Sequence, residues 1–290
     1  MAARKRKRTV LRTLRKVLGL ALLLPAALLL LLLLFWGNER RNYCEGSCPS
    51  WLTAGPIAHR GLCGDPGVDE NSLSAFRKAV EAGYAIELDV RYTSDMVPMI
   101  LHDYNMTRLF GADTQLSRLT YEEARTLTYL NSGEPLPTLE EVLALVDGQV
   151  PLLIELKAYH LPGEFEDRVV ALLRAYDGPF VIQSNNPLAL NYVKKLDPDI
   201  PVGLLIDDIP GLPHSRRGRI LMDNLFGAIC RPAFLVYNCA LVEDGELDVY
   251  RTGGSVVLGY LFHEDDLTSD AWLSKVDGII FTQKADEPDP

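Results

Sequence analysis

A small set of residues in this chain has the side chains needed for acid–base and phosphate chemistry. Two histidines could transfer protons, three acidic residues could hold a hard cation, and an arginine and a lysine could bind an anion. These residues lie in the fragments His59-Arg60-Gly61, Glu70-Asn71, Glu87-Leu88-Asp89, His102-Asp103 and Glu155-Leu156-Lys157. Each fragment alone occurs by chance in ordinary proteins. Together and in this order they are the equipment of a metal-assisted phosphodiesterase.

The segments that must position these residues alternate between short apolar runs and stretches with helical periodicity. The predicted strands are Pro56 to His59, Ala85 to Arg91, Val97 to His102, Pro151 to Leu156, Phe180 to Gln183, Val202 to Ile206, Phe234 to Tyr237, Val256 to Phe262 and Gly278 to Thr282. The predicted helices are Ser72 to Ala82, Thr120 to Thr126, Thr138 to Val146, Phe165 to Ala175, Pro187 to Leu196 and Asp265 to Val276.

This alternation predicts an α/β fold built from parallel βαβ units. Nine strand candidates predict a (β/α)8 TIM barrel in which one strand forms a hairpin excursion. An open doubly wound sheet is the alternative, although no GxGxxG motif follows a strand to support a dinucleotide site. In a barrel the functional residues lie at the C-terminal ends of the strands. We therefore expect His59 to end the first strand, His102 to close the third, and Glu155 and Lys157 to end the fourth.

Three carboxylates are expected to converge in the barrel mouth. Glu87 and Asp89 are two residues apart in one strand and so share a face, and Glu155 would join them from a later strand. Buried unpaired carboxylates cost several kcal/mol each, so we expect a cation among them. Ligation by oxygen alone selects Mg²⁺ or Ca²⁺. The alternative is that the carboxylates form ion pairs with Arg60, Arg91 and Lys157.

Over roughly residues 56 to 284 these motifs resemble the glycerophosphodiester phosphodiesterase family, within the phospholipase-C-like TIM-barrel phosphodiesterases. The resemblance implies a metal at Glu87, Asp89 and Glu155, and proton transfers by His59 and His102. One histidine would assist the attack on phosphorus by a neighbouring hydroxyl of the substrate, and the other would protonate the leaving alcohol. The sequence leaves open which does which. The implied products are an alcohol and glycerol 3-phosphate.

Several further residues are assigned roles around this centre. Arg60 and Lys157 would neutralise the non-bridging phosphate oxygens. Glu70, in an Asp-Glu-Asn-Ser stretch, matches the centre of the family's Pro-Glu-Asn-Thr motif, and we expect it to support the site from behind and to cap the first helix. Gln183 is a candidate substrate contact. The family's Trp-Thr-Val-Asn run is absent, and this chain has Gly259 to His263 in its place. In the family these positions help shape the pocket for the alcohol group, so the sequence supports the type of reaction better than the identity of the substrate.

The N-terminus predicts a membrane anchor. Residues 1–16 carry eight basic residues and no acid, and Val17 to Trp36 is an uncharged apolar run of 20 residues. Such a run can span the ~30 Å hydrocarbon core of a bilayer. Only Arg40 and Arg41 closely follow it, so the positive-inside rule puts the N-terminus in the cytoplasm and the remainder outside. We expect an uncleaved signal anchor, with a cleaved signal peptide as the alternative.

The expected organisation is a cytoplasmic basic segment, a transmembrane anchor, a linker and a barrel domain, at residues 1–16, 17–36, 37–50 and 51–290. Beyond residue 50 there are 19 basic and 37 acidic residues, a net charge of −18, which argues against general binding of nucleic acid or anionic lipid. Cys44 and Cys48 in the linker could form a disulfide or remain thiols.

The sequence thus predicts a phosphodiesterase held at the outer face of the membrane, acting on glycerophosphodiesters or a related lipid or envelope phosphodiester. One alternative is a catalytically silent surface barrel that binds a lipid headgroup, a glycan or a protein. Another is a related barrel phospholipase that releases a cyclic phosphate. The acid, base and cation positions are all present, which favours an enzyme, since a decayed site would be expected to lose some.

Overall fold

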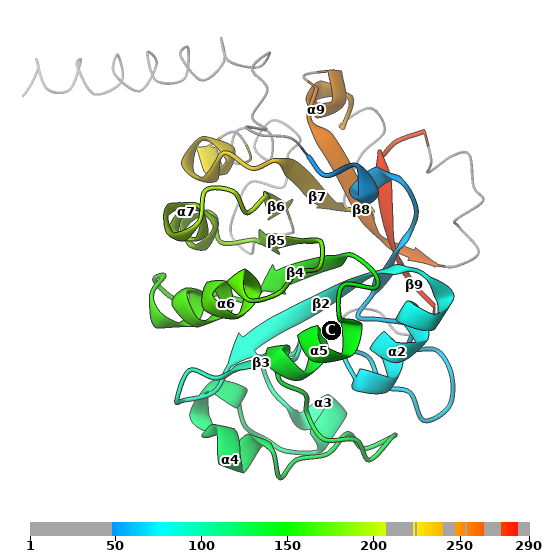
Figure 1. Cartoon of the computed structure of the whole chain (residues 1–290), viewed down its shortest axis with the longest axis vertical. Helices are drawn as coiled ribbons and strands as arrows, with labels where there is room; N and C mark the ends of the chain where they lie inside the picture. The colour runs from blue at the N-terminus through cyan, green and yellow to red at the C-terminus, as the bar shows by residue number, and fades with distance from the viewer. Residues whose placement is uncertain are drawn as a thin grey trace, which may run out of the picture. The chain divides into compact units, whose positions relative to one another are not determined.

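The computed structural model describes residues 48–206, 223, 225–239, 247–252, 254–263 and 274–283, all within one compact unit, Asn42–Pro290 (Figure 1). Our predicted cytoplasmic segment, membrane anchor and most of the linker lie outside these residues. Within the described part of the chain, no helix combines the length and the apolar character needed to cross a membrane.

Eight parallel strands form a closed barrel. In order around it they are β1 (Ile57–His59), β2 (Ala85–Tyr92), β4 (Leu152–Leu156), β5 (Phe180–Ser184), β6 (Val202–Ile206), β7 (Phe234–Asn238), β8 (Val256–His263) and β9 (Gly278–Thr282). The sheet closes because β1 pairs with β2 on one side and with β9 on the other. The predicted TIM barrel is therefore confirmed, and the open doubly wound sheet is wrong.

A ninth strand, β3 (Pro98–Ile100), forms the hairpin excursion and pairs antiparallel with β2. It runs back along β2, so that the Leu101 N–H donates to the carbonyl of Asp89 at 3.0 Å. We expected His102 to close the third strand as a barrel strand. It lies instead two residues beyond β3, and it reaches the barrel mouth from the excursion.

The excursion continues below the barrel strands in Figure 1 as a small substructure with its own apolar core. Its elements are α3 (Thr107–Phe110), η2 (Leu116–Arg118) and α4 (Tyr121–Ala124). Thr120 caps α4 in a capping box with Glu123, as its sequence predicts. This local core lets the excursion hold side chains in fixed positions beside the barrel mouth.

Helices cover the outside of the barrel. They are α2 (Leu73–Ala82), α5 (Leu139–Val146), α6 (Glu164–Arg174), α7 (Pro187–Leu196) and α9 (Asp248–Thr252), and residues 225–230 are also helical. Their apolar faces pack against outward-facing strand residues such as Leu88 and Ile154 in the larger core. Thr138 caps α5 in a second capping box. Of the predicted helix Asp265 to Val276, residues 265–273 lie outside the described part.

The barrel interior is apolar except at its C-terminal mouth. The inward-facing apolar residues include Ile57, Leu153, Val181, Phe234, Leu258 and Ile280. η1 (Ser50–Thr53) closes the opposite end with Leu52, whose carbonyl lies so near Gly278 that a Cβ there would meet it at 2.3 Å. Polar side chains in the barrel are therefore gathered at one end, next to the loops that follow the strands.

Candidate active site

Three buried carboxylates meet at the mouth. Glu87 and Asp89 lie on β2, Glu155 lies on the neighbouring β4, and Asp89 and Glu155 occupy paired positions. Each is at most 5% exposed, and one oxygen from each lies within 4.8 Å of the others. The alternation of side chains along the strands thus brings together the three residues that we assigned to a cation.

The charges around these carboxylates are only partly balanced. Lys157 Nζ lies 2.7 Å from Glu155 Oε1 and 3.1 Å from Asp89 Oδ1, and Arg60 Nε lies 3.3 Å from Asp89 Oδ2. The ion-pair alternative is therefore partly realised. Its third partner does not take part, because Arg91 donates to the carbonyl of His102. Two cations face three carboxylates.

The pKa values reflect this imbalance. Burial, together with the charges of Asp89 and Glu155, raises the pKa of Glu87 well above its ordinary value. Burial also raises the pKa of Glu155, against the attraction of Lys157. Burial acts in the same direction on Asp89, but Lys157, His102 and Arg60 outweigh it and lower the pKa of Asp89. A carboxylate cluster that favours proton uptake in this way fits a divalent hard cation, which would balance the same charge.

A tight turn after β1 places Arg60 beside the carboxylates. Arg60 adopts a left-handed conformation (φ 57°), and its N–H donates to Glu87 Oε2 at 3.1 Å. Gly61 follows with φ 82°, and a Cβ there would lie 2.9 Å from the backbone of Ala75. The His-Arg-Gly sequence is therefore explained by two backbone requirements as well as by side-chain chemistry.

Glu70 supports the site but does not cap a helix. Its carboxylate accepts from Arg60 Nη1 at 2.9 Å and from Arg108 Nη2 at 2.7 Å. The cap of α2 is Ser72, whose hydroxyl accepts from the Ala75 N–H, so our expectation that Glu70 caps this helix is wrong. The sequence analysis singled out the Glu70-Asn71 fragment but assigned no role in the site to Asn71, the residue between them. It has φ 57° and donates from Nδ2 to Asp89 Oδ2 at 2.8 Å.

The two histidines have different partners. His59 Nδ1 lies 2.9 Å from Thr282 Oγ1, and its Nε2 lies 3.9 Å from Glu87 Oε2. His102 Nδ1 lies 3.1 Å from Asp103 Oδ1. Burial raises the pKa of Asp103, but hydrogen bonds from His102 and Arg108 outweigh it and lower the pKa well below its usual range. Because ionised Asp103 can only accept, His102 must donate from Nδ1, which leaves its Nε2 for the pocket.

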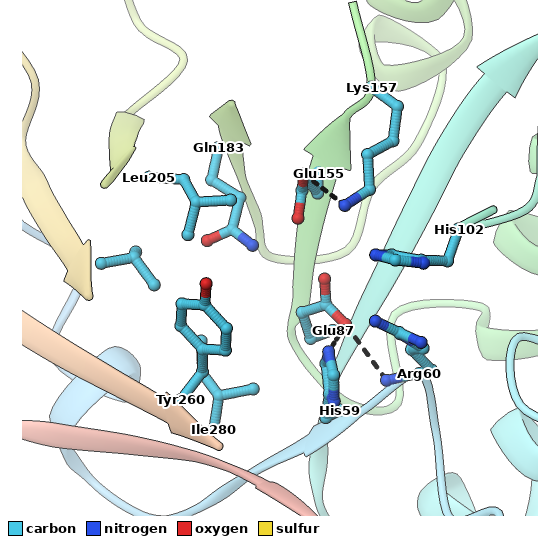
Figure 2. A pocket seen from close by; sticks show the side chains of 11 residues that line it. His59, Arg60, Glu87, His102, Glu155, Lys157, Gln183, Leu205, Tyr260 and Ile280 are labelled. Carbon is cyan, nitrogen blue, oxygen red and sulfur yellow. Dashed lines mark hydrogen bonds and ion pairs between the residues drawn. The ribbon is translucent and has the colours of Figure 1, made fainter. Parts of the chain in front are cut away.

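One pocket joins these residues, and its two sides differ in chemistry (Figure 2). The charged side is formed by His59, Arg60, Glu87, His102, Glu155 and Lys157. The other side is apolar apart from one phenol and one amide and is formed by Leu205, Val236, Tyr260, Ile280 and Gln183. Gln183 is 2% exposed, and its Oε1 accepts no hydrogen bond from the described part of the chain. A hydroxyl donor on a bound molecule would satisfy this oxygen.

Sequence reasoning missed Thr282 and Tyr260. Thr282 reaches His59 only because the last strand pairs with the first, so only the closure of the barrel relates the two positions. Tyr260 lies in the Gly259 to His263 segment, whose positions the family resemblance placed around the alcohol group, but we did not single out this residue. The inward-facing alternation along β8 could have identified it, since Leu258 and Tyr260 both belong to the barrel interior.

The fold and the site together define a parallel (β/α)8 barrel in which histidines, carboxylates and two cationic side chains line one pocket at the C-terminal mouth. Residues 59–285 match the glycerophosphoryl diester phosphodiesterase family. The chain belongs to this family.

Individual relatives agree with this assignment. The chain is 38% identical over 236 residues to "probable glycerophosphodiester phosphodiesterase 2" of Mycobacterium tuberculosis, a match that covers 79% of this chain and 87% of that protein. It is 34% identical over 161 residues to a glycerophosphodiester phosphodiesterase of Caldanaerobacter subterraneus, covering 51% of this chain and 65% of that relative. The structure of an Oleispira antarctica phosphodiesterase in complex with the product sn-glycerol-3-phosphate superposes with a TM-score of 0.68 at 24% identity. That match covers 79% of this chain and 93% of that chain, and it supports the fold.

Proposed function

We propose that the chain hydrolyses glycerophosphodiesters to an alcohol and glycerol 3-phosphate. The observation that carries this proposal is the convergence of both histidines and the cations Arg60 and Lys157 on one pocket, in a chain of this family. A second pocket feature fits the same substrate class. The amide of Gln183 and the apolar side of the pocket can contact a glycerol or alcohol substituent while the charged side holds the phosphate.

Arg60 and Lys157 would bind the non-bridging oxygens of the phosphodiester. Lys157 is buried. Burial lowers its pKa, but the charges of Asp89 and Glu155 outweigh burial and raise the pKa above its ordinary value, so Lys157 stays protonated. A buried permanent cation interacts strongly with an anion because little water screens it. The charge that develops on phosphate oxygens during displacement would therefore be stabilised by groups that are already in place.

The two histidines would move the protons. One would accept the proton of the substrate's attacking hydroxyl as its oxygen bonds to phosphorus, and the other would donate a proton to the oxygen of the departing alcohol. Water would then open the resulting cyclic phosphodiester, with the two proton transfers reversed, to give glycerol 3-phosphate. Histidine is the side chain that most often serves as a general acid or base. His102 is prepared for such a transfer by its Nδ1 contact with Asp103, and His59 by its contact with Thr282. We leave the two roles open between them.

Glu87, Asp89 and Glu155 would hold one divalent cation, Mg²⁺ or Ca²⁺. When bound, it would polarise a phosphate oxygen and neutralise developing charge. Oxygen-only donors and the raised pKa values of Glu87 and Glu155 support this assignment.

The direct test is hydrolysis of a small panel of glycerophosphodiesters by purified protein, with Mg²⁺, with Ca²⁺ and with EDTA. We expect glycerol 3-phosphate and a free alcohol, formed only with a divalent cation. Accumulation of a cyclic phosphate as the final product would favour the related phospholipase reaction instead. Absence of turnover on every diester, in protein that is folded and binds the cation, would favour the silent binding barrel.

We also propose that the barrel domain lies outside the cytoplasm and stays joined to its anchor. The support is the basic segment at residues 1–16 and the apolar run Val17 to Trp36. Protease added to intact cells or spheroplasts should digest residues 51–290. Full protection of that segment would contradict this topology.

A further inference from the structure

Arg108 connects the two halves of the charged side of the pocket, although it does not line the pocket itself. It lies in α3 of the excursion, and its side chain is 30% exposed. Its guanidinium holds two carboxylates at once. Nε and Nη2 donate to Asp103 at 2.8 and 2.9 Å, and Nη1 and Nη2 donate to Glu70 at 2.9 and 2.7 Å.

Each of these carboxylates holds a residue that does line the pocket. Asp103 contacts His102 at Nδ1 (3.1 Å), and Glu70 contacts Arg60 at Nη1 (2.9 Å). Two chains of charged hydrogen bonds therefore start from one guanidinium, one ending at a proton-transfer group and the other at a phosphate-binding group. Charged hydrogen bonds of this bidentate kind fix direction as well as distance.

Among the described residues, Arg108 alone links these two series of hydrogen bonds. Without Arg108, Glu70 would still accept a hydrogen bond from Arg60. Asp103 would lose the two hydrogen bonds from Arg108 and keep only the one from His102. A carboxylate at the rim that loses a bidentate arginine gains freedom to rotate toward water. The ring of His102 would then lose its fixed orientation, because its Nδ1 contact is with that carboxylate.

We propose that Arg108 is a positioning residue that sets the Nδ1–H tautomer and orientation of His102 through Asp103 and the placement of Arg60 through Glu70. The proposal rests on the proposed function for its kinetic consequences, but its structural consequence does not depend on any activity. The excursion between β3 and α5 would then contribute Arg108 to the site as well as His102.

Arg108→Ala should lower kcat/KM on an alkyl glycerophosphodiester by roughly 10²-fold, the scale expected when a reacting group is misplaced by about 1 Å. Arg108→Lys should recover only part of the loss, because an ammonium cannot hold both carboxylates in a fork. Since the site of Arg108 is open to solvent, added guanidinium at sub-denaturing concentration should restore part of the activity of Arg108→Ala. Ethylammonium should restore less.

Arg125 provides a matched control. It lies in the same excursion, is 26% exposed and makes a bidentate pair with Glu141, away from the pocket. Arg125→Ala should keep the wild-type kcat and should not respond to guanidinium. In a His102→Ala background, Arg108→Ala should cost much less than in wild type, since only the Arg60 branch remains to be lost.

The tautomer of His102 can be measured without substrate, by ¹⁵N NMR of histidine-labelled protein at a pH where the ring is neutral. We expect the Nδ1–H tautomer in wild type and in Arg125→Ala, and a shift toward Nε2–H in Arg108→Ala. A wild type that hydrolyses no diester would sink the proposed function but leave this measurement intact. If Arg108→Ala keeps both the Nδ1–H tautomer and, in an active enzyme, the wild-type kcat/KM, Arg108 has no positioning role.

Discussion

Replacing Glu87 by Gln should stabilise the metal-free protein and destabilise the cation-bound protein relative to wild type. Gln keeps the shape of Glu and can still accept from the Arg60 N–H, which bonds Glu87 Oε2 at 3.1 Å. It removes one of three negative charges whose oxygens lie within 4.8 Å of one another. At that distance each like-charge pair repels by about 3.5 kcal/mol for an effective dielectric constant of ~20.

Glu87 takes part in two such pairs, and its attraction to Arg60 and Lys157 offsets much of their repulsion. At a pH where Glu87 is ionised, we therefore expect the metal-free variant to be more stable than wild type by roughly 1–3 kcal/mol. Each kcal/mol corresponds to about 2–4 °C in Tm. A cation at about 100 times its Kd should stabilise the wild type by about 2.7 kcal/mol. The variant, with one carboxylate fewer, should gain less, so the order of stabilities reverses.

The pH dependence has a definite sign. Because burial and the neighbouring carboxylates raise the pKa of Glu87, the metal-free folded protein binds a proton that the unfolded chain releases. This contribution to stability is fully present below the unfolded pKa and is lost as the pH rises through the folded pKa. In Glu87→Gln, the stability of the metal-free protein should therefore fall less steeply as the pH rises.

The assay is thermal unfolding of residues 1–290 in EDTA, in Mg²⁺ and in Ca²⁺ across this pH range. Glu141→Gln, at the half-buried pair with Arg125, is a matched control. Its stability in EDTA should stay close to that of wild type, and it should gain as much from the cation as wild type does. If Glu87→Gln is less stable than wild type in EDTA and gains as much from the cation, the carboxylates are not a cation site.

Three other predictions concern the pocket. Lys157→Met should weaken binding of glycerol 3-phosphate by roughly 10-fold or more, the worth of a lost charged hydrogen bond, as measured by calorimetry; unchanged affinity would remove Lys157 from phosphate binding. Gln183→Leu should raise KM more than it lowers kcat, because it removes a buried acceptor facing the substrate, and equal KM values would show that no substrate donor uses it. Asp103→Asn should mainly lower kcat, because Asp103 contacts His102, and Glu70→Gln should mainly raise KM, because Glu70 contacts Arg60. The reverse pattern would contradict these two assignments.

The barrel could be predicted because its strands are short apolar runs with helical patterns between them, and all nine strand candidates correspond to strands. The sequence did not show which strand leaves the barrel. β3 is as apolar as its neighbours, and only its antiparallel pairing with β2 identifies it. His102 was thus expected at the mouth for the wrong reason, as the end of a barrel strand.

The charged side of the site was predictable to the extent that it depends on neighbours in sequence. Glu87 and Asp89 share a face because they are two residues apart in a strand. The contact of Asn71 with Asp89 was not predicted, because it requires a left-handed backbone at Asn71 that the sequence pattern does not indicate. Arg108 was missed because its long side chain acts from a four-residue helix, at a distance set by the folding of the whole excursion.

The most direct test of the account compares His59→Ala and His102→Ala with wild type on two diesters, by following glycerol 3-phosphate in ³¹P NMR and p-nitrophenol by absorbance. On an alkyl glycerophosphodiester, each variant should lose ~10²-fold or more in kcat while staying folded and cation-bound. On a p-nitrophenyl phosphodiester, whose leaving group needs no proton, the variant lacking the acid should recover much of its rate and the variant lacking the base should not. Near-wild-type rates for both variants on both diesters would contradict the account, because the histidines would then be structural.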